Sequence, residues 1–67
     1  MSYIDRMHEE QRQLQERITK LVAFISSSAY QLLSPVDHGL LLQQLEYMRG
    51  YDYVLSRRLA RTTTSNA

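Results

Sequence analysis

Hydrophobic positions in residues 3–27 recur every three or four residues, which is the period of one face of an α-helix. Charged side chains occupy the remaining faces of this stretch. Ser2 precedes the pattern, and a serine hydroxyl can accept a hydrogen bond from a first-turn N–H. We therefore predict a helix over residues 3–27 with a heptad seam along one side, formed by Ile4, Met7, Gln11, Leu14, Ile18, Leu21 and Ile25.

A second helical pattern begins after Ser34 and continues to residue 60. Pro35 suits the first helical position, because its missing N–H has no partner there, and Asp37 favours the positive end of the helix dipole. The apolar side chains cover about half the circumference, whereas one neighbouring helix requires a stripe of only about 100°. We therefore predict two neighbours for this helix, one of them from another chain. The side chains concerned are Leu40, Leu41, Leu45, Met48, Tyr51, Val54, Leu55 and Leu59.

The connection between the two patterns is short, which predicts an all-α antiparallel two-helix hairpin. Ser26–Ser28 weakens the first helix, since serine hydroxyls compete for backbone groups, and residues 29–33 are expected to form a short helical turn. We expect residues 1–61 to form the hairpin domain, which dimerises into a four-helix arrangement, and residues 62–67 to form a disordered tail. The predicted core and dimer residues are Leu14, Ile18, Leu21, Ile25, Leu41, Leu45, Met48 and Leu55.

Four details of the hairpin lead to further expectations. Gln11 is either a half-hydrated residue near a helix end or a polar residue that sets register across an oligomer interface. Gly39 and Gly50 each cost a helix about 1 kcal/mol, and close approach of another helix is one reason to keep them. Tyr47 and Tyr51 are expected at the edge of the core. The acidic first turns are expected beside the basic end of the second helix, at Arg57, Arg58 and Arg61.

Size and composition favour an oligomer. The chain has 67 residues, a net charge of +1 and no cysteine, so neither a disulfide nor a thiolate metal site can stabilise its small core. The small net charge argues against a nucleic-acid or membrane partner. No apolar run approaches the roughly 20 residues of a membrane span, and the N-terminus lacks the order of a signal peptide.

Catalytic motifs are incomplete in this sequence. His8-Glu9 resembles the start of a zinc-protease motif, but Arg12 stands where the second histidine is required. His38 follows Asp37, yet adjacent helical residues point about 100° apart. Ser26–Ser28 has no nearby base to activate a nucleophile. We therefore expect a protein that is not an enzyme and has no metal or cofactor.

Tyrosine and arginine side chains in the second half are the best candidates for partner binding. Both residue types are frequent at the centre of protein interfaces, and both can also contact nucleic acid. Leu42, Arg49 and Tyr53 fall within about 40° of each other on the helical wheel, away from the predicted core. We predict that these three residues form a partner-binding patch, with Tyr30 near the connection as a second candidate.

Four segments of the chain carry a family pattern: residues 21–27, 41–45, 48–51 and 54–59. Their sequences are LVAFISS, LLQQL, MRGY and VLSRRL. The combination resembles a large group of very small bacteriophage proteins that form helical hairpins, and the resemblance covers residues 14–60. Leu59 stands where the pattern usually has isoleucine. The pattern consists mainly of packing positions, so it identifies no functional residues.

Within this group the chain most resembles the quorum-sensing anti-activators of Pseudomonas phages. The resemblance implies a homodimer in the cytoplasm of the infected bacterial host. It also implies two host partners, the DNA-binding domain of the LuxR-type activator LasR and the type IV pilus assembly ATPase. An alternative from another class is a phage protein that sequesters cyclic nucleotide signals of antiphage defence. Direct DNA binding is disfavoured by the small net charge.

Overall fold

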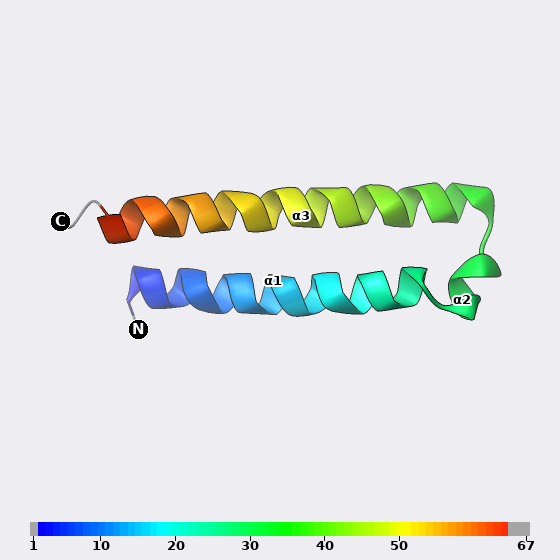
Figure 1. Ribbon diagram of the computed structural model, residues 1–67, viewed down its shortest axis with the longest axis horizontal. Helices are drawn as coiled ribbons and strands as arrows, with labels where there is room; N and C mark the ends of the chain where they lie inside the picture. The colour runs from blue at the N-terminus through cyan, green and yellow to red at the C-terminus, as the bar shows by residue number, and fades with distance from the viewer. Residues whose placement is uncertain (1, 65–67) are drawn as a thin grey trace.

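Two long antiparallel helices make up almost all of the chain in the computed structural model, which describes residues 2–64. Helix α1 spans Tyr3–Ile25, the short helix α2 spans Ser28–Gln31, and α3 spans Pro35–Thr64. In Figure 1, α1 and α3 lie side by side, α2 closes one end, and both chain ends lie at the other. The molecule measures 51 × 18 × 14 Å. The predicted all-α hairpin with a helical turn in its connection is confirmed.

Serine side chains cap the starts of the helices. The Asp5 N–H donates to Ser2 Oγ at 3.1 Å, as the sequence predicts for α1. At the start of α3, the Asp37 N–H donates to Ser34 Oγ at 3.2 Å, and this hydroxyl donates to Asp37 Oδ2 at 3.1 Å. The pair satisfies an N–H group that no helical carbonyl can reach.

The ends of the helices differ from the predictions by a few residues. The Tyr30 N–H donates to the hydroxyl of Ser27 at 3.4 Å, so α2 begins at Ser28, one residue earlier than expected. Helix α3 continues to Thr64 instead of giving way to a disordered tail at residue 62. Continuation adds one backbone hydrogen bond for each residue fixed, and the Thr62 hydroxyl donates to the Arg58 carbonyl at 2.8 Å. Residues 65–67 of the predicted tail lie outside the described part of the chain.

The core is a single line of side chains between α1 and α3. Of the predicted core residues, Leu14, Leu45 and Leu55 are buried, and Leu55 is 0% exposed. Met7 and Leu59 complete the buried set. The other predicted residues remain partly exposed because two helices have no third element to cover them: Ile18, Leu21, Ile25, Leu41 and Met48.

Gln11 joins the two helices within one chain. Its amide Nε2 donates to Ser56 Oγ at 2.7 Å and to Asp52 Oδ1 at 3.1 Å. Gln15 Nε2 also donates to Asp52 Oδ1, at 3.3 Å. Gln11 is therefore a polar residue that favours one register, but the register is that of the hairpin itself, and the partners lie on α3.

Two expectations about α3 are wrong for the single chain. Tyr47 and Tyr51 are 66% and 43% exposed, so they lie outside the core, not at its edge. A Cβ atom built on Gly39 or Gly50 would have nothing within 4 Å. The hairpin therefore does not bring another helix close to either glycine. The tyrosines are exposed because the apolar residues of α3 extend beyond the sector that α1 covers.

Candidate binding surfaces

Helix α3 carries an exposed line of apolar side chains beside the core, which we call the apolar strip. The exposed fractions run from 43% for Tyr51 to 71% for Val36. The members follow helical spacing, so they share one side of α3, about 110° around from the side that contacts α1. The sequence predicted an excess of apolar surface on this helix, and the structure leaves that surface open. The strip consists of Val36, Leu40, Tyr47, Tyr51 and Val54.

The predicted partner patch lies on the other flank of α3. Leu42 is 51% exposed, Tyr53 is 62% exposed, and Arg49 is also exposed. The three side chains therefore lie outside the core, as their positions on the wheel suggested. Core face, apolar strip and patch divide the circumference of α3 into three sectors roughly 120° wide. Binding of a partner by the patch stays a prediction.

Tyr30, the second candidate, is engaged within the closed end. Its ring stacks on His38 with centroids 4.2 Å apart and meets Phe24 edge-on at 6.2 Å. The Tyr30 hydroxyl donates to the His38 carbonyl at 3.3 Å, and His38 Nε2 lies 2.6 Å from the Tyr30 carbonyl oxygen. These contacts fix α2 against the start of α3, so Tyr30 has a structural role in the hairpin.

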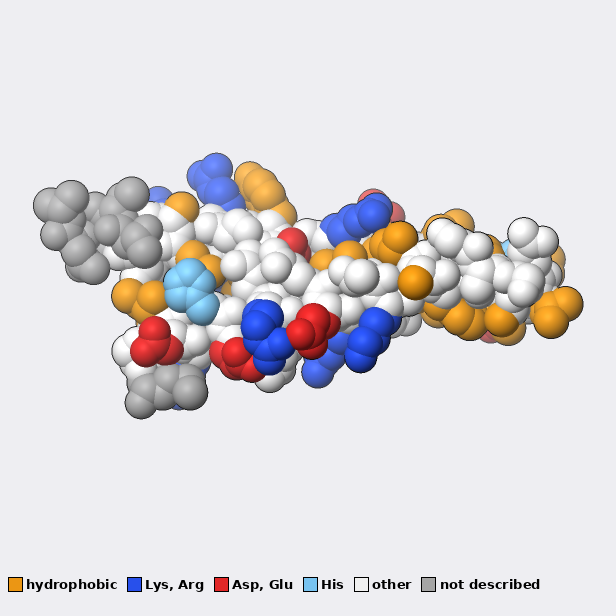
Figure 2. Space-filling model, turned by 60° about the horizontal axis from the view of Figure 1, so that its bottom comes forward, with side chains coloured by type: hydrophobic (Ala, Val, Ile, Leu, Met, Phe, Trp, Pro, Cys, Tyr) orange, Lys and Arg blue, Asp and Glu red, His pale blue; other side chains and the backbone are white. Residues whose placement is uncertain are grey.

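Charge is distributed unevenly along the hairpin. Asp37 is the only Asp, Glu, Lys or Arg between residues 22 and 45. Figure 2 shows hydrophobic side chains gathered around the closed end at the right, and charged side chains over the centre and the open half. Leu32, in the connection, is 88% exposed. An exposed apolar end of this kind is a common feature of surfaces that meet another protein.

A shallow hollow lies at the open end, between the start of α1 and the last turns of α3. Its lining comprises Tyr3, Arg6, Met7, Glu10 and Arg58. The Arg58 guanidinium lies 5.9 Å from the centroid of the Tyr3 ring and donates to the Tyr3 hydroxyl. The sequence predicted that the arginine cluster lies beside the acidic first turns, but it did not predict the contact of Arg58 with Tyr3. An aromatic ring at the start of α1 was the feature of the sequence that could have indicated it.

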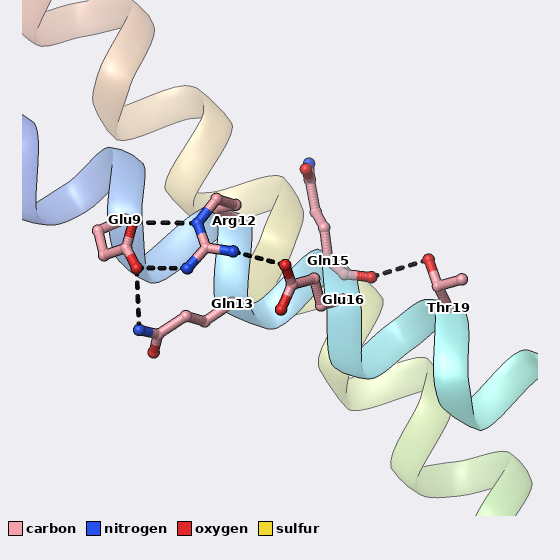
Figure 3. Close-up of polar contacts among 6 residues, drawn as sticks. All are labelled: Glu9, Arg12, Gln13, Gln15, Glu16 and Thr19. Atoms are coloured by element: carbon pink, nitrogen blue, oxygen red, sulfur yellow. Dashed lines mark hydrogen bonds and ion pairs between the residues drawn. The ribbon is translucent and has the colours of Figure 1, made fainter.

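The solvent face of α1 carries a small ionic network, drawn in Figure 3. Arg12 donates to Glu9 Oε2 at 3.0 Å and to Glu16 Oε1 at 2.5 Å, while Gln13 Nε2 donates to Glu9 Oε1 at 3.1 Å. The hydrogen bonds from Arg12 and Gln13 lower the pKa of Glu9 to about 2. The bond to Glu9 in turn raises the pKa of Arg12. The groups are about half exposed, so this network is a solvated helix surface.

The described residues contain no group of three or more His, Asp or Glu side chains arranged to hold a metal ion. None of the described helices combines the length and apolar character of a membrane span. The candidate binding surfaces among the described residues are flat or shallow: an apolar strip, a mixed patch and an open hollow. Such surfaces suit binding to another molecule.

Comparison with known protein families identifies the family of this chain. The profile of the Sequestin family matches residues 1–61. The chain belongs to the Sequestin family. This name suggests a small protein that binds and sequesters another molecule, in agreement with the binding surfaces described above. No curated protein and no solved structure shows significant similarity to this Sequestin chain.

Proposed function

We propose that this Sequestin chain is a phage-encoded, non-enzymatic inhibitor that binds a host regulatory protein as a homodimer. The observation that carries the proposal is the division of α3 into a core face, an apolar strip and a separate exposed patch. The proposed target is a LuxR-type quorum-sensing activator, through the DNA-binding domain of LasR. The type IV pilus assembly ATPase is a further proposed target. The site of action is the cytoplasm of the infected host.

Exposure of the apolar strip supports the homodimer. Five large hydrophobic side chains on one side of a helix are costly to leave in water, at about 25 cal/mol for each Å² of apolar surface. The strip is also compatible with a twofold axis at Tyr47. In an antiparallel pair of α3 helices about that axis, Leu40 of one chain faces Val54 of the other, and each Tyr47 faces its own copy.

Composition of the patch supports protein binding outside the dimer interface. Arg49 stands between Leu42 and Tyr53 along α3, and arginine and tyrosine dominate the energetics of many protein interfaces. A long side chain such as arginine keeps its charge hydrated until a partner covers it. In a dimer the patch occurs twice, so it suits an elongated or twofold target such as a dimeric activator.

The test is direct binding of purified LasR DNA-binding domain, measured by calorimetry with the parent chain and with single variants. Tyr53→Ala and Arg49→Ala are expected to weaken binding by at least about 1 kcal/mol each and to shift the melting temperature by only a few degrees. Arg17→Ala, an exposed arginine on α1, is the matched control and is expected to bind as the parent does. Absence of binding by the parent chain would refute the LasR assignment.

The hollow at the open end supports a second candidate function, the sequestration of a cyclic nucleotide signal. An exposed tyrosine ring can stack on a base, and two nearby guanidinium groups can bind phosphate. Tyr3, Arg6 and Arg58 bring these groups together. The hollow is open, so one chain would cover only part of such a ligand.

Heating the purified protein and separating the supernatant by chromatography tests this second function. Sequestration predicts release of an ultraviolet-absorbing nucleotide by the parent chain and little release by Arg58→Ala. Arg57→Ala, which changes the neighbouring arginine outside the hollow, is the control and is expected to release as much as the parent. Failure to release or bind any cyclic dinucleotide or trinucleotide would remove this candidate.

A further inference from the structure

The side of α3 that points away from α1 has no neighbour in the hairpin. We call it the outer face of α3, and over residues 39–53 it is formed by Gly39, Leu42, Glu46, Arg49, Gly50 and Tyr53. All six are exposed. A shallow hollow along residues 35–46 spans the border between this face and the apolar strip. Gly39, Leu42 and Glu46 line it from the outer face, and Val36 and Leu40 line it from the strip.

The two glycines give the outer face an unusual shape. Glycine inside a helix costs about 1 kcal/mol relative to alanine, and nothing within 4 Å of Gly39 or Gly50 accounts for that cost. Both glycines lie on the same side of α3, about 16 Å apart along its axis. Lacking side chains, they allow a second backbone to approach more closely than the rest of the helix does.

Charge and hydrophobic character along the outer face are self-complementary. An antiparallel second copy, related by a twofold axis between residues 47 and 48, places Glu46 opposite Arg49 and Leu42 opposite Tyr53. Twofold symmetry repeats each contact, giving two opposite-charge pairs and two leucine–tyrosine pairs. Gly50 lies about 4 Å from the axis along the helix, where the two backbones are nearest.

Other arrangements of the same face fit less well. In a parallel, in-register pair of α3 helices, each Glu46 would face the Glu46 of the other copy and each Arg49 would face the other Arg49. Such like-charge contacts are unfavourable. An unrelated helix would need an acidic group opposite Arg49, a basic group opposite Glu46 and apolar groups at both ends. The outer face of a second copy already carries that pattern.

We propose that the outer face of α3 pairs with the outer face of a second copy in this antiparallel register. Because Leu42, Arg49 and Tyr53 belong to this face, the pairing covers the partner patch. Self-association through the outer face and binding of a host protein then exclude each other. This regulatory consequence rests on the proposed function of the patch, whereas the pairing itself does not depend on it. The apolar strip lies on a different sector of α3 and stays available to a separate copy.

Charge reversal tests the pairing, with particle mass measured by sedimentation equilibrium over a range of protein concentrations. Glu46→Arg and Arg49→Glu each place like charges opposite one another, so each is expected to reduce the limiting mass at least about twofold relative to the parent. The double variant Glu46→Arg/Arg49→Glu restores opposite charges and is expected to recover the parent mass. Arg17→Glu on α1 changes net charge by the same amount as Arg49→Glu and is expected to keep the parent mass.

Circular dichroism of each variant separates loss of pairing from loss of fold. If the folded single variants keep the parent mass, or if the folded double variant does not recover it, the proposed pairing is wrong. Partner binding is the separate arm. Glu46→Arg leaves the patch residues unchanged, so it is expected to bind LasR DNA-binding domain more tightly than the parent at concentrations where the parent self-associates. No binding by any variant would reject the proposed partner and leave the mass result standing.

Discussion

Leu55 is the residue on which the stability of the hairpin depends most. It is 0% exposed, and no other large side chain in the described chain is fully buried. It lies on the core face of α3 within a core only one layer thick. We therefore predict that Leu55→Ala is among the most destabilising conservative substitutions that this protein can undergo.

The expected magnitude follows from the cost of emptying a buried site. Leu→Ala substitutions in protein cores cost about 2–5 kcal/mol, with the higher values where the surroundings cannot relax into the cavity. Two helices without a third layer can relax partly, so we expect about 3 kcal/mol for Leu55→Ala. A chain of this length has a total stability of roughly 3–10 kcal/mol. The substitution should therefore remove a large part of the free energy of unfolding.

Urea denaturation followed by circular dichroism at 222 nm measures this loss, and Leu42→Ala supplies the control. Leu42 lies on the same helix but is 51% exposed, so in protein dilute enough to be unpaired its truncation should change the free energy of unfolding by less than about 0.5 kcal/mol. We also expect the melting temperature of Leu55→Ala to fall by more than about 10 °C. Equal effects of the two substitutions would contradict the assignment of the core face.

Three further predictions address the ionic network of α1, the outer face of α3 and the dimer. The pKa of Glu9 is about 2 in the folded chain, against an ordinary value of 4.5. Its stabilising contribution is therefore complete above pH 4.5 and disappears as pH falls through 2. In Glu9→Gln the melting temperature should fall less steeply than in the parent as pH is lowered over this range. In protein dilute enough to be unpaired, Gly39→Ala should raise the free energy of unfolding by up to about 1 kcal/mol, since open space surrounds the site within the hairpin; a decrease in urea midpoint under these conditions would contradict this assignment. In this cysteine-free chain, Tyr47→Cys should form a disulfide-linked dimer under mild oxidation, whereas Tyr53→Cys should not; the reverse result would show that the apolar strip is not the dimer interface.

The sequence predicted the fold well because its strongest signals are local. The 3–4 spacing in α1 and the Ser34-Pro35 start of α3 depend only on neighbouring residues. Buried residues such as Leu14, Leu45 and Leu55 follow from that spacing. The end of α3 was less predictable, because a polar sequence does not reveal that a helix already formed will continue.

The candidate surfaces were harder to predict. Exposure of Leu42, Arg49 and Tyr53 followed from the helical wheel, but Tyr47 and Tyr51 were assigned to the edge of the core because a wheel does not show how narrow a sector one helix covers. The contact of Arg58 with Tyr3 joins residues 55 positions apart, and it depends on the register of α1 against α3. Register is a property of the whole hairpin, so local patterns do not determine it.

The polar contact of Gln11 with Asp52 and Ser56 has a consequence for how the chain folds. Most contacts of a helical hairpin lie within its helices and join residues near one another in sequence, which favours rapid folding. Because the seam consists of similar apolar residues, shifting one helix by a heptad, roughly 10 Å, would still bury most of their side chains. Only the correct alignment brings the Gln11 amide to its acceptors near the far end. A misaligned hairpin lacks these hydrogen bonds and is therefore less stable than the native alignment. The Gln11 contacts thus favour the correct register as the two helices pair.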